Sequence, residues 1–91
     1  MAYYFEVCDE SLQRAVWAKG KISPTHNADV YRQDMCGAWM QYDQHGKVTK
    51  WGWEIDHVKP LAKDGSDDLS NLQPLFWKNN RRKGDTYPWS C

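Results

Sequence analysis

Hydrophobic residues recur with helical spacing near the start of the chain. Those at positions i, i+3 and i+4 are Leu12, Ala15 and Val16. This spacing places them on one face of a helix, with Ser11 as a permitted N-cap and Gly20 as a stop signal. The pattern predicts a short helix that covers the core, followed by an irregular connection over residues 21–29.

Two stretches rich in aromatic and β-branched residues follow, over 35–42 and 47–58. The polar residues 43–46 between them are typical of a hairpin turn. We therefore expect the two stretches to pair as antiparallel strands. Alternation along the second strand places His57 on the same face as the tryptophans and Asp56 on the opposite face.

A long polar loop then leads to a final strand and helix. Twelve residues lie between Val58 and Asn71, and loops of this length inside a compact domain are often functional. Residues 71–75 are expected to be extended, and residues 76–83 to form a helix that Gly84 ends. The order strand, long loop, short strand, helix indicates an α+β fold.

The length and composition describe one folded domain. A chain of 91 residues, 41% of them hydrophobic, has room for a single core. No apolar stretch is long enough for a signal peptide or a membrane span, so we expect a cytoplasmic protein with no membrane partner. The cysteines, Cys8, Cys36 and Cys91, form no C-x-x-C pair, and we expect free thiols.

Charge gives little indication of the partner. Twelve basic residues balance twelve acidic ones, whereas a dedicated nucleic-acid binder usually carries a strong positive excess. The distribution is uneven, however. A basic cluster near the C-terminus comprises Lys78, Arg81, Arg82 and Lys83. The polar loop before it carries Asp64, Asp67 and Asp68, which are most simply solvated.

Three segments carry a candidate chemistry. They are Glu54-Ile55-Asp56-His57-Val58-Lys59-Pro60, then Asn71-Leu72-Gln73-Pro74-Leu75, then Lys78-Asn79-Asn80-Arg81-Arg82-Lys83-Gly84-Asp85. In identity and spacing, this combination resembles the HNH endonuclease family, also described as His-Me finger or ββα-metal nucleases. The resemblance covers roughly the last 40 residues. It implies an antiparallel hairpin with a long loop and a packed C-terminal helix.

The resemblance also suggests how the chain is divided. We expect one HNH nuclease domain over residues 1–91, with a ββα-metal core at about 35–85. A helical and loop extension over residues 1–34 precedes that core and includes the short N-terminal helix. Many relatives bind a structural zinc through two C-x-x-C pairs. Phe76 and Asn79 stand where the second pair would be, so we expect no structural zinc.

Each residue of the motif receives a role from the resemblance. Asp56 is implied as a metal ligand, His57 as the general base and Asn71 as the residue that pins the loop. Asn80 is implied as the second ligand because it lies nine positions after Asn71, which makes the chain an H-N-N variant. Chemistry alone does not choose between Asn80 and Asn79, but the family spacing leaves Asn79 as a surface or capping residue.

Phosphodiester hydrolysis explains why these residue types are required. The reaction needs a base to deprotonate water and a positive charge to stabilise the departing oxygen. A neutral imidazole suits the first task, and one hard cation suits the second, Mg²⁺ first and Mn²⁺ or another divalent ion as alternatives. Phosphate contacts are expected from Lys78, Arg81, Arg82 and Lys83. Glu54 is expected to be either an outer-shell partner or merely solvated.

The geometry of a strand raises one difficulty. Because Asp56 and His57 are neighbours, an ideal strand would direct them to opposite faces. A single site that uses both needs a local distortion, and Pro60 with the loop gives the strand a reason to end there.

The leading hypothesis is a metal-dependent endonuclease that nicks or cleaves double-stranded DNA. One alternative is a non-catalytic module that binds nucleic acid or a protein partner. Another is the nuclease subunit of a phage packaging or restriction-type assembly, in which a partner supplies the DNA affinity. A bacterial or phage-encoded protein fits all three. The sequence does not indicate which DNA sequence is preferred, whether DNA or RNA is the substrate, or what the oligomeric state is.

Overall fold

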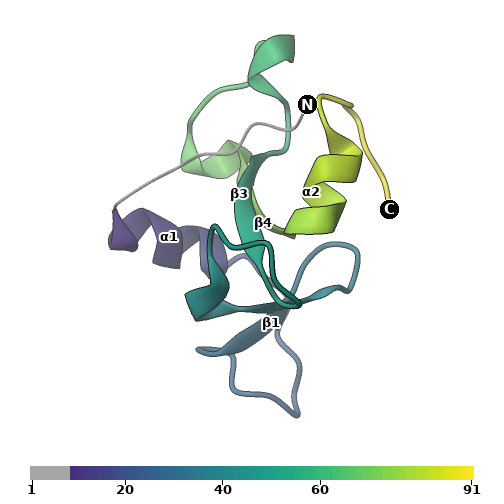
Figure 1. Ribbon diagram of the computed structural model, residues 1–91. Helices are drawn as coiled ribbons and strands as arrows, with labels where there is room; N and C mark the ends of the chain where they lie inside the picture. The colour runs from purple at the N-terminus through teal and green to yellow at the C-terminus, as the bar shows by residue number, and fades with distance from the viewer. Residues whose placement is uncertain (1–8) are drawn as a thin grey trace.

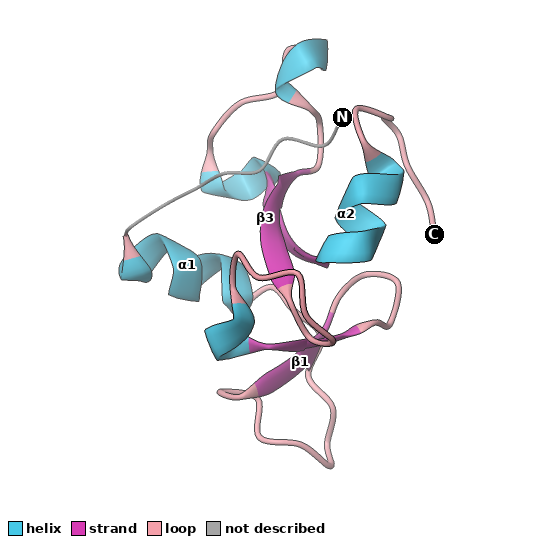
Figure 2. Ribbon diagram, viewed as in Figure 1, coloured by secondary structure: helices cyan, strands magenta, loops and turns pink. Residues whose placement is uncertain are grey.

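An antiparallel hairpin lies at the centre of the computed structural model, which describes residues 9–91 (Figure 1). Its strands are β3, Trp53–His57, and β4, Leu72–Phe76. Helix α1, Glu10–Trp17, and helix α2, Trp77–Lys83, lie on opposite sides of this hairpin (Figure 2). The expected α+β order of strand, long loop, short strand and helix is therefore confirmed.

The second hairpin differs from the expected pairing of residues 35–42 with 47–58. Strand β1, Tyr31–Gln33, pairs with β2, Trp39–Gln41. The strand at 39–41 therefore pairs with a segment that precedes it in sequence, and not with residues 47–58. The predicted turn at 43–46 is wrong, because Tyr42–Gln44 forms a short 3₁₀ helix instead. The β1–β2 hairpin therefore crosses the boundary that we expected near residue 34 between the N-terminal extension and the ββα-metal core.

The chemistry of the actual turn explains the difference. Asp34 Oδ1 accepts hydrogen bonds from the backbone N–H groups of Cys36 and Ala38, each at 2.9 Å. Gly37 has a φ of 83°, a conformation that glycine adopts without steric cost. An acidic side chain that caps its own turn and a left-handed glycine close β1 onto β2.

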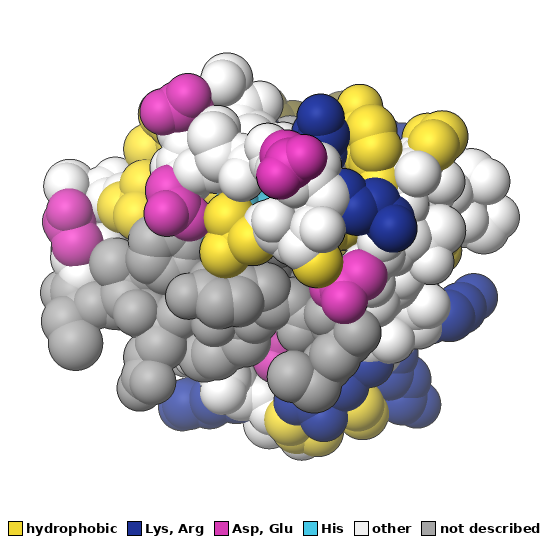
Figure 3. Space-filling view, turned by 90° about the horizontal axis from the view of Figure 1, so that it is seen from above, with side chains coloured by type: hydrophobic (Ala, Val, Ile, Leu, Met, Phe, Trp, Pro, Cys, Tyr) yellow, Lys and Arg dark blue, Asp and Glu magenta, His cyan; other side chains and the backbone are white. Residues whose placement is uncertain are grey.

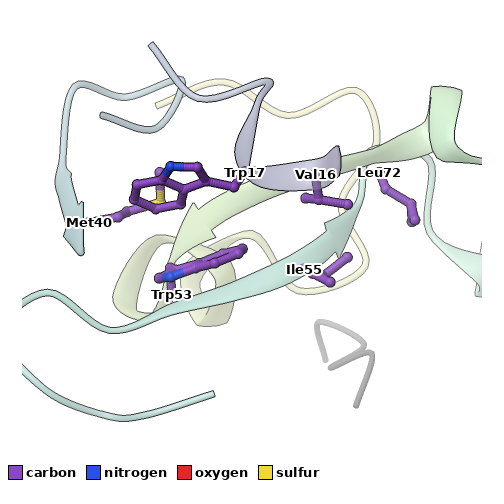
Figure 4. Close-up of a cluster of buried hydrophobic side chains, with 6 residues drawn as sticks. All are labelled: Val16, Trp17, Met40, Trp53, Ile55 and Leu72. Carbon is purple, nitrogen blue, oxygen red and sulfur yellow. The ribbon is translucent and has the colours of Figure 1, made fainter. Parts of the chain in front are cut away.

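The core lies between α1 and the two hairpins. Figure 4 shows its buried side chains, Val16, Trp17, Met40, Trp53, Ile55 and Leu72. The rings of Trp17 and Trp53 lie 5.2 Å apart, and Trp53 is fully buried. Alternate residues of β3 thus face the core on one side of the hairpin and α2 on the other.

The ends of the helices follow local chemistry. The N-cap of α1 is Asp9, whose carboxylate accepts from Ser11 N at 2.9 Å, so the expected cap at Ser11 is wrong by two positions. Gly84, with a φ of 56°, ends α2 as expected. Within residues 9–91, neither helix is long and apolar enough to cross a lipid bilayer.

A disulfide corrects the expectation of free thiols. Cys36 and Cys91 are bonded, with Cα atoms 5.5 Å apart and a sequence separation of 55, while Cys8 lies outside the described residues. The bridge ties the C-terminal segment to the turn of the β1–β2 hairpin. Its spacing carries no sequence signature, and disulfides are rare in the cytoplasm that we expected.

Removing this bridge is expected to destabilise the protein. Cys36→Ser with Cys91→Ser should lower the free energy of unfolding by about 2–4 kcal/mol, because the unfolded chain regains the entropy of a long loop. Urea unfolding measures the loss, with Cys8→Ser as the matched control that leaves the bridge intact. Equal stability of the double variant and the control, or free thiols at Cys36 and Cys91 by mass spectrometry, would contradict the pairing.

Candidate active site

A layer of polar side chains is buried between β3 and α2. Glu54 and Asp56 lie on the face of β3 that meets the helix, because residues two apart on a strand share a face. Asn80 Nδ2 donates to Glu54 Oε1 at 2.8 Å, and Lys83 Nζ lies 3.2 Å from Asp56 Oδ1. All four residues are buried, so their charges and amides are held in a water-poor interface.

The Asp56 carboxylate is anchored on both oxygens. Gln73 Nε2 donates to its Oδ2 at 2.9 Å from the paired strand, while Lys83 contacts its Oδ1. Burial raises the pKa of the Asp56 carboxyl above its ordinary value, and the hydrogen bond from Gln73 and the charge of Lys83 oppose this shift. No local pattern in the sequence predicts this contact of Gln73.

Geometry distinguishes the two asparagines of α2. Asn79 uses both ends of its amide, since Nδ2 donates to Asp34 Oδ2 at 3.0 Å and Oδ1 accepts from Arg82. It is buried, so the expectation of a surface residue is wrong. The Oδ1 atom of Asn80 is also buried, yet no hydrogen bond reaches it from the described residues. Such an atom is costly unless a ligand satisfies it.

His57 contacts the long loop instead of α2. Its Nε2 lies 2.7 Å from Asp67 Oδ1, and its backbone carbonyl accepts from Lys83 Nζ at 2.9 Å. Strand β3 keeps regular pairing through His57 and Leu72, so the expected distortion between Asp56 and His57 is not found within the strand. The two groups are still close enough for the charge of His57 to lower the pKa of Asp56, against the dominant effect of burial.

Asp67 is the residue that the sequence reasoning missed. It was expected to be solvated with the other loop acids, and its side chain is indeed 66% exposed, while that of His57 is 1% exposed. Its carboxylate nevertheless reaches the imidazole across ten positions of sequence. No local pattern separates Asp67 from Asp64 or Asp68, because the contact depends on how the loop folds back.

Asn71 holds this loop closed. Its Oδ1 accepts from Lys59 N at 2.9 Å, and its Nδ2 donates to the carbonyls of Lys59 and Ser66 at 3.0 and 2.8 Å. The backbone at Gly65 passes close to the Lys59 carbonyl, and only glycine fits there, because a Cβ would lie 1.7 Å from the Lys59 oxygen. These bonds hold the backbone of Lys59, two residues after His57, and of Ser66, the residue before Asp67.

The basic residues of α2 divide into two groups. Lys78, Arg81 and Arg82 are exposed, and Arg81 reaches Glu54 at 3.4 Å. Viewed from above, Lys and Arg side chains gather toward the right and lower edges of the molecule (Figure 3). Lys83 is 2% exposed and pairs with Asp56, so the expectation that it joins the surface cations is wrong. Its ammonium offsets the buried carboxylate charge.

Among residues 9–91, no group of three or more His, Cys, Asp or Glu side chains gathers in a way that could hold a metal ion. The oxygens that face the β3–α2 interface are carboxylates and one amide, from Asp56, Glu54 and Asn80. Oxygen donors of this kind suit a hard divalent cation, with the remaining positions open to water and phosphate.

Comparisons with known proteins agree with this architecture. Residues 43–86 match the HNH endonuclease family, a segment that contains β3, the long loop, β4 and α2. The comparisons with curated proteins and with solved structures returned no significant match. Members of the family are nucleases that act on nucleic acid and generally use a divalent metal. By this match, residues 43–86 of the chain are an HNH endonuclease domain.

Proposed function

We propose that the protein is a metal-dependent DNA endonuclease with one divalent cation held by Asp56 and Asn80. The observation that carries the proposal is the buried Oδ1 of Asn80, which accepts no hydrogen bond from the described residues. Glu54 fixes the amide by accepting from its Nδ2, so the amide oxygen is the end available to a cation. Asp56 supplies the anionic ligand from the facing strand.

The residues divide the work of hydrolysis. Bound between Asp56 and Asn80, Mg²⁺ or Mn²⁺ would supply charge that stabilises the departing oxygen. His57 accepts the proton of the attacking water. Asn71 keeps the loop in the position that holds the imidazole. The exposed side chains of Lys78, Arg81 and Arg82 contact neighbouring phosphates and position the strand without reading its sequence.

Asp67 determines which nitrogen of His57 can act as the base. A carboxylate next to Nε2 favours the tautomer that carries its proton there, which leaves Nδ1 as the proton acceptor. Nδ1 is buried. We therefore propose that the loop shifts when DNA and water enter the site, while Asp67 keeps its hydrogen bond to the ring.

The asparagine pair offers a matched test of the metal site. Asn80→Ala should raise the Mg²⁺ concentration for half-maximal nicking by at least about tenfold, because one of two protein ligands is lost. Asn79→Ala removes the neighbouring amide and should leave this concentration unchanged, although the loss of the Asp34 contact lowers stability. A Mg²⁺ titration of plasmid nicking compares them, and equal midpoints for both variants would contradict the assignment.

The loop acids offer a matched test of His57. Asp67→Ala should slow nicking at saturating Mg²⁺ by at least about tenfold, because the imidazole loses the group that sets its tautomer. Asp68→Ala removes the same charge from the next position of the loop and should leave the rate within a factor of about two. Initial nicking rates decide between them. If both variants nick at the wild-type rate, the Asp67 contact has no role in the reaction.

The charge balance favours a second candidate, a nuclease subunit of a phage packaging or restriction-type assembly. Twelve basic and twelve acidic residues leave little net attraction for DNA. A partner would then supply the affinity, and the single domain over residues 1–91 would supply the active site. Tight binding of plasmid DNA by the isolated chain, with a steep dependence on salt, would argue against this candidate.

A further inference from the structure

An aromatic hollow lies on the outer face of the β1–β2 hairpin. It has a volume of about 270 Å³ and is lined by His26, Tyr31, Trp39 and Trp51. Met40 on β2 points into the core, so its strand neighbour Trp39 and the paired-strand residue Tyr31 face the other way. The hollow is therefore separate from both the core and the β3–α2 interface.

The rings surround this space and do not fill it. His26 and Trp39 have centroids 4.3 Å apart, and Tyr31 meets Trp51 edge to face at 5.6 Å. His26 is exposed and Tyr31, Trp39 and Trp51 are only half-buried, so their rings leave apolar surface open to solvent and do not belong to the core. Flat aromatic surfaces around an open space instead match a planar aromatic ligand.

Cationic and aromatic side chains connect the hollow to the candidate active site. Lys50 lies over the ring of Trp51 at 5.1 Å. The adjoining residue Thr49 accepts through its carbonyl from the indole N–H of Trp77 at 2.7 Å. The guanidinium of Arg81 lies over the ring of Trp77, 5.4 Å from its centroid. Arg81 also pairs with Glu54, which holds Asn80. Lys78 also lies over the Trp77 ring, at 5.6 Å. The hollow and the candidate active site are therefore linked by a surface on which three cationic side chains lie over two indole rings.

We propose that the aromatic hollow binds one unpaired nucleobase of the DNA substrate, whose backbone follows Lys50, Lys78 and Arg81 toward Asn80. Proteins that hold single strands combine stacking rings with a positively charged track in this way. The volume admits a single base and is smaller than the pockets of about 300–1,000 Å³ that take drug-sized ligands. The inference rests on the proposed function for the identity of the ligand, and it narrows the substrate to DNA with an unpaired stretch beside the cleaved bond.

Binding measurements in EDTA test the hollow without requiring cleavage. The probes are fluorescent oligothymidylate and an oligomer of equal length made of abasic nucleotides, which carries the same charge but no bases. Wild-type protein should bind oligothymidylate about 5- to 100-fold more tightly, as expected when one base stacks on aromatic side chains. Equal affinity for the two oligomers would overturn the proposal.

Substitutions in the hollow identify which aromatic side chain gives the preference for oligothymidylate over the abasic oligomer. Trp39→Leu should reduce the preference for oligothymidylate to near unity and leave abasic binding unchanged, while Trp39→Phe should keep most of it. Lys78→Ala, the matched control, should weaken both oligomers equally, because Lys78 lies over Trp77, outside the hollow, and its removal takes away a phosphate contact. If Trp39→Leu does not fold, Trp51→Leu tests the opposite wall, and a preference that survives in the folded variant contradicts the site.

The proposal and the nuclease assignment can fail separately. Plasmid nicking with no preference between the two oligomers would reject the hollow and leave the nuclease intact. A clear preference without any cleavage would support the hollow and reject the nuclease.

Discussion

His57→Ala is expected to lower the rate of plasmid nicking at saturating Mg²⁺ by about 10²- to 10⁴-fold. The variant removes the group that we propose takes the proton from the attacking water. It leaves in place the proposed metal ligands, Asp56 and Asn80, and the exposed cations of α2 that we propose contact DNA. The loss should therefore appear in the rate at saturating substrate and metal, with little change in the concentrations that saturate the enzyme.

Two controls make this result specific to the imidazole. Added imidazole should restore part of the activity of His57→Ala, because a free base can occupy the space that the side chain leaves. His45→Ala removes a half-buried histidine that packs against Trp53 at 4.7 Å and should keep nicking at wild-type rate once folded. If His57→Ala nicks as fast as the wild type, the base has been assigned to the wrong residue.

Trp53→Ala is expected to lower the free energy of unfolding by about 3–5 kcal/mol. The side chain is fully buried and contacts Trp17, Tyr42 and His45, so its removal leaves a cavity that the hairpin cannot fill. A domain of this size is stabilised by only about 5–15 kcal/mol in total, and much of that margin would be lost.

Urea unfolding followed by circular dichroism measures this change. Ile22→Ala is the matched control, because Ile22 is 64% exposed and exposed substitutions usually change stability by less than about 0.5 kcal/mol. Equal midpoints for Trp53→Ala and Ile22→Ala would show that the core does not depend on this tryptophan.

Local patterns predicted the central part of the fold. The spacing of apolar residues gave α1, and Gly84 gave the end of α2, because both signals act within a few residues. The β1–β2 pairing was not predicted. The polar segment 43–46 had the composition of a turn, but the strands turn at residues 34–38, where the Asp34 side chain caps the turn and Gly37 is left-handed. Composition alone does not rank such turns.

The candidate site was also predicted from the sequence only in part. Asp56, His57, Asn71 and Asn80 follow from motif spacing, which depends on sequence separation alone. Their partners do not, because contacts such as His57 to Asp67 and Lys83 to Asp56 depend on how the loop and helix pack. The Cys36–Cys91 bridge is also a tertiary fact, since it joins segments 55 positions apart. A charged residue at a helix end gives no sign that it will be buried, as Lys83 is.

The central claim, metal-dependent cleavage of DNA by this chain, is tested most directly by supercoiled plasmid incubated with the wild-type protein in Mg²⁺ and in EDTA. The predicted result is conversion to nicked or linear DNA with 5′-phosphate and 3′-hydroxyl ends in Mg²⁺, and intact plasmid in EDTA. Cleavage at the same rate in EDTA, or intact plasmid in both Mg²⁺ and Mn²⁺, would contradict it.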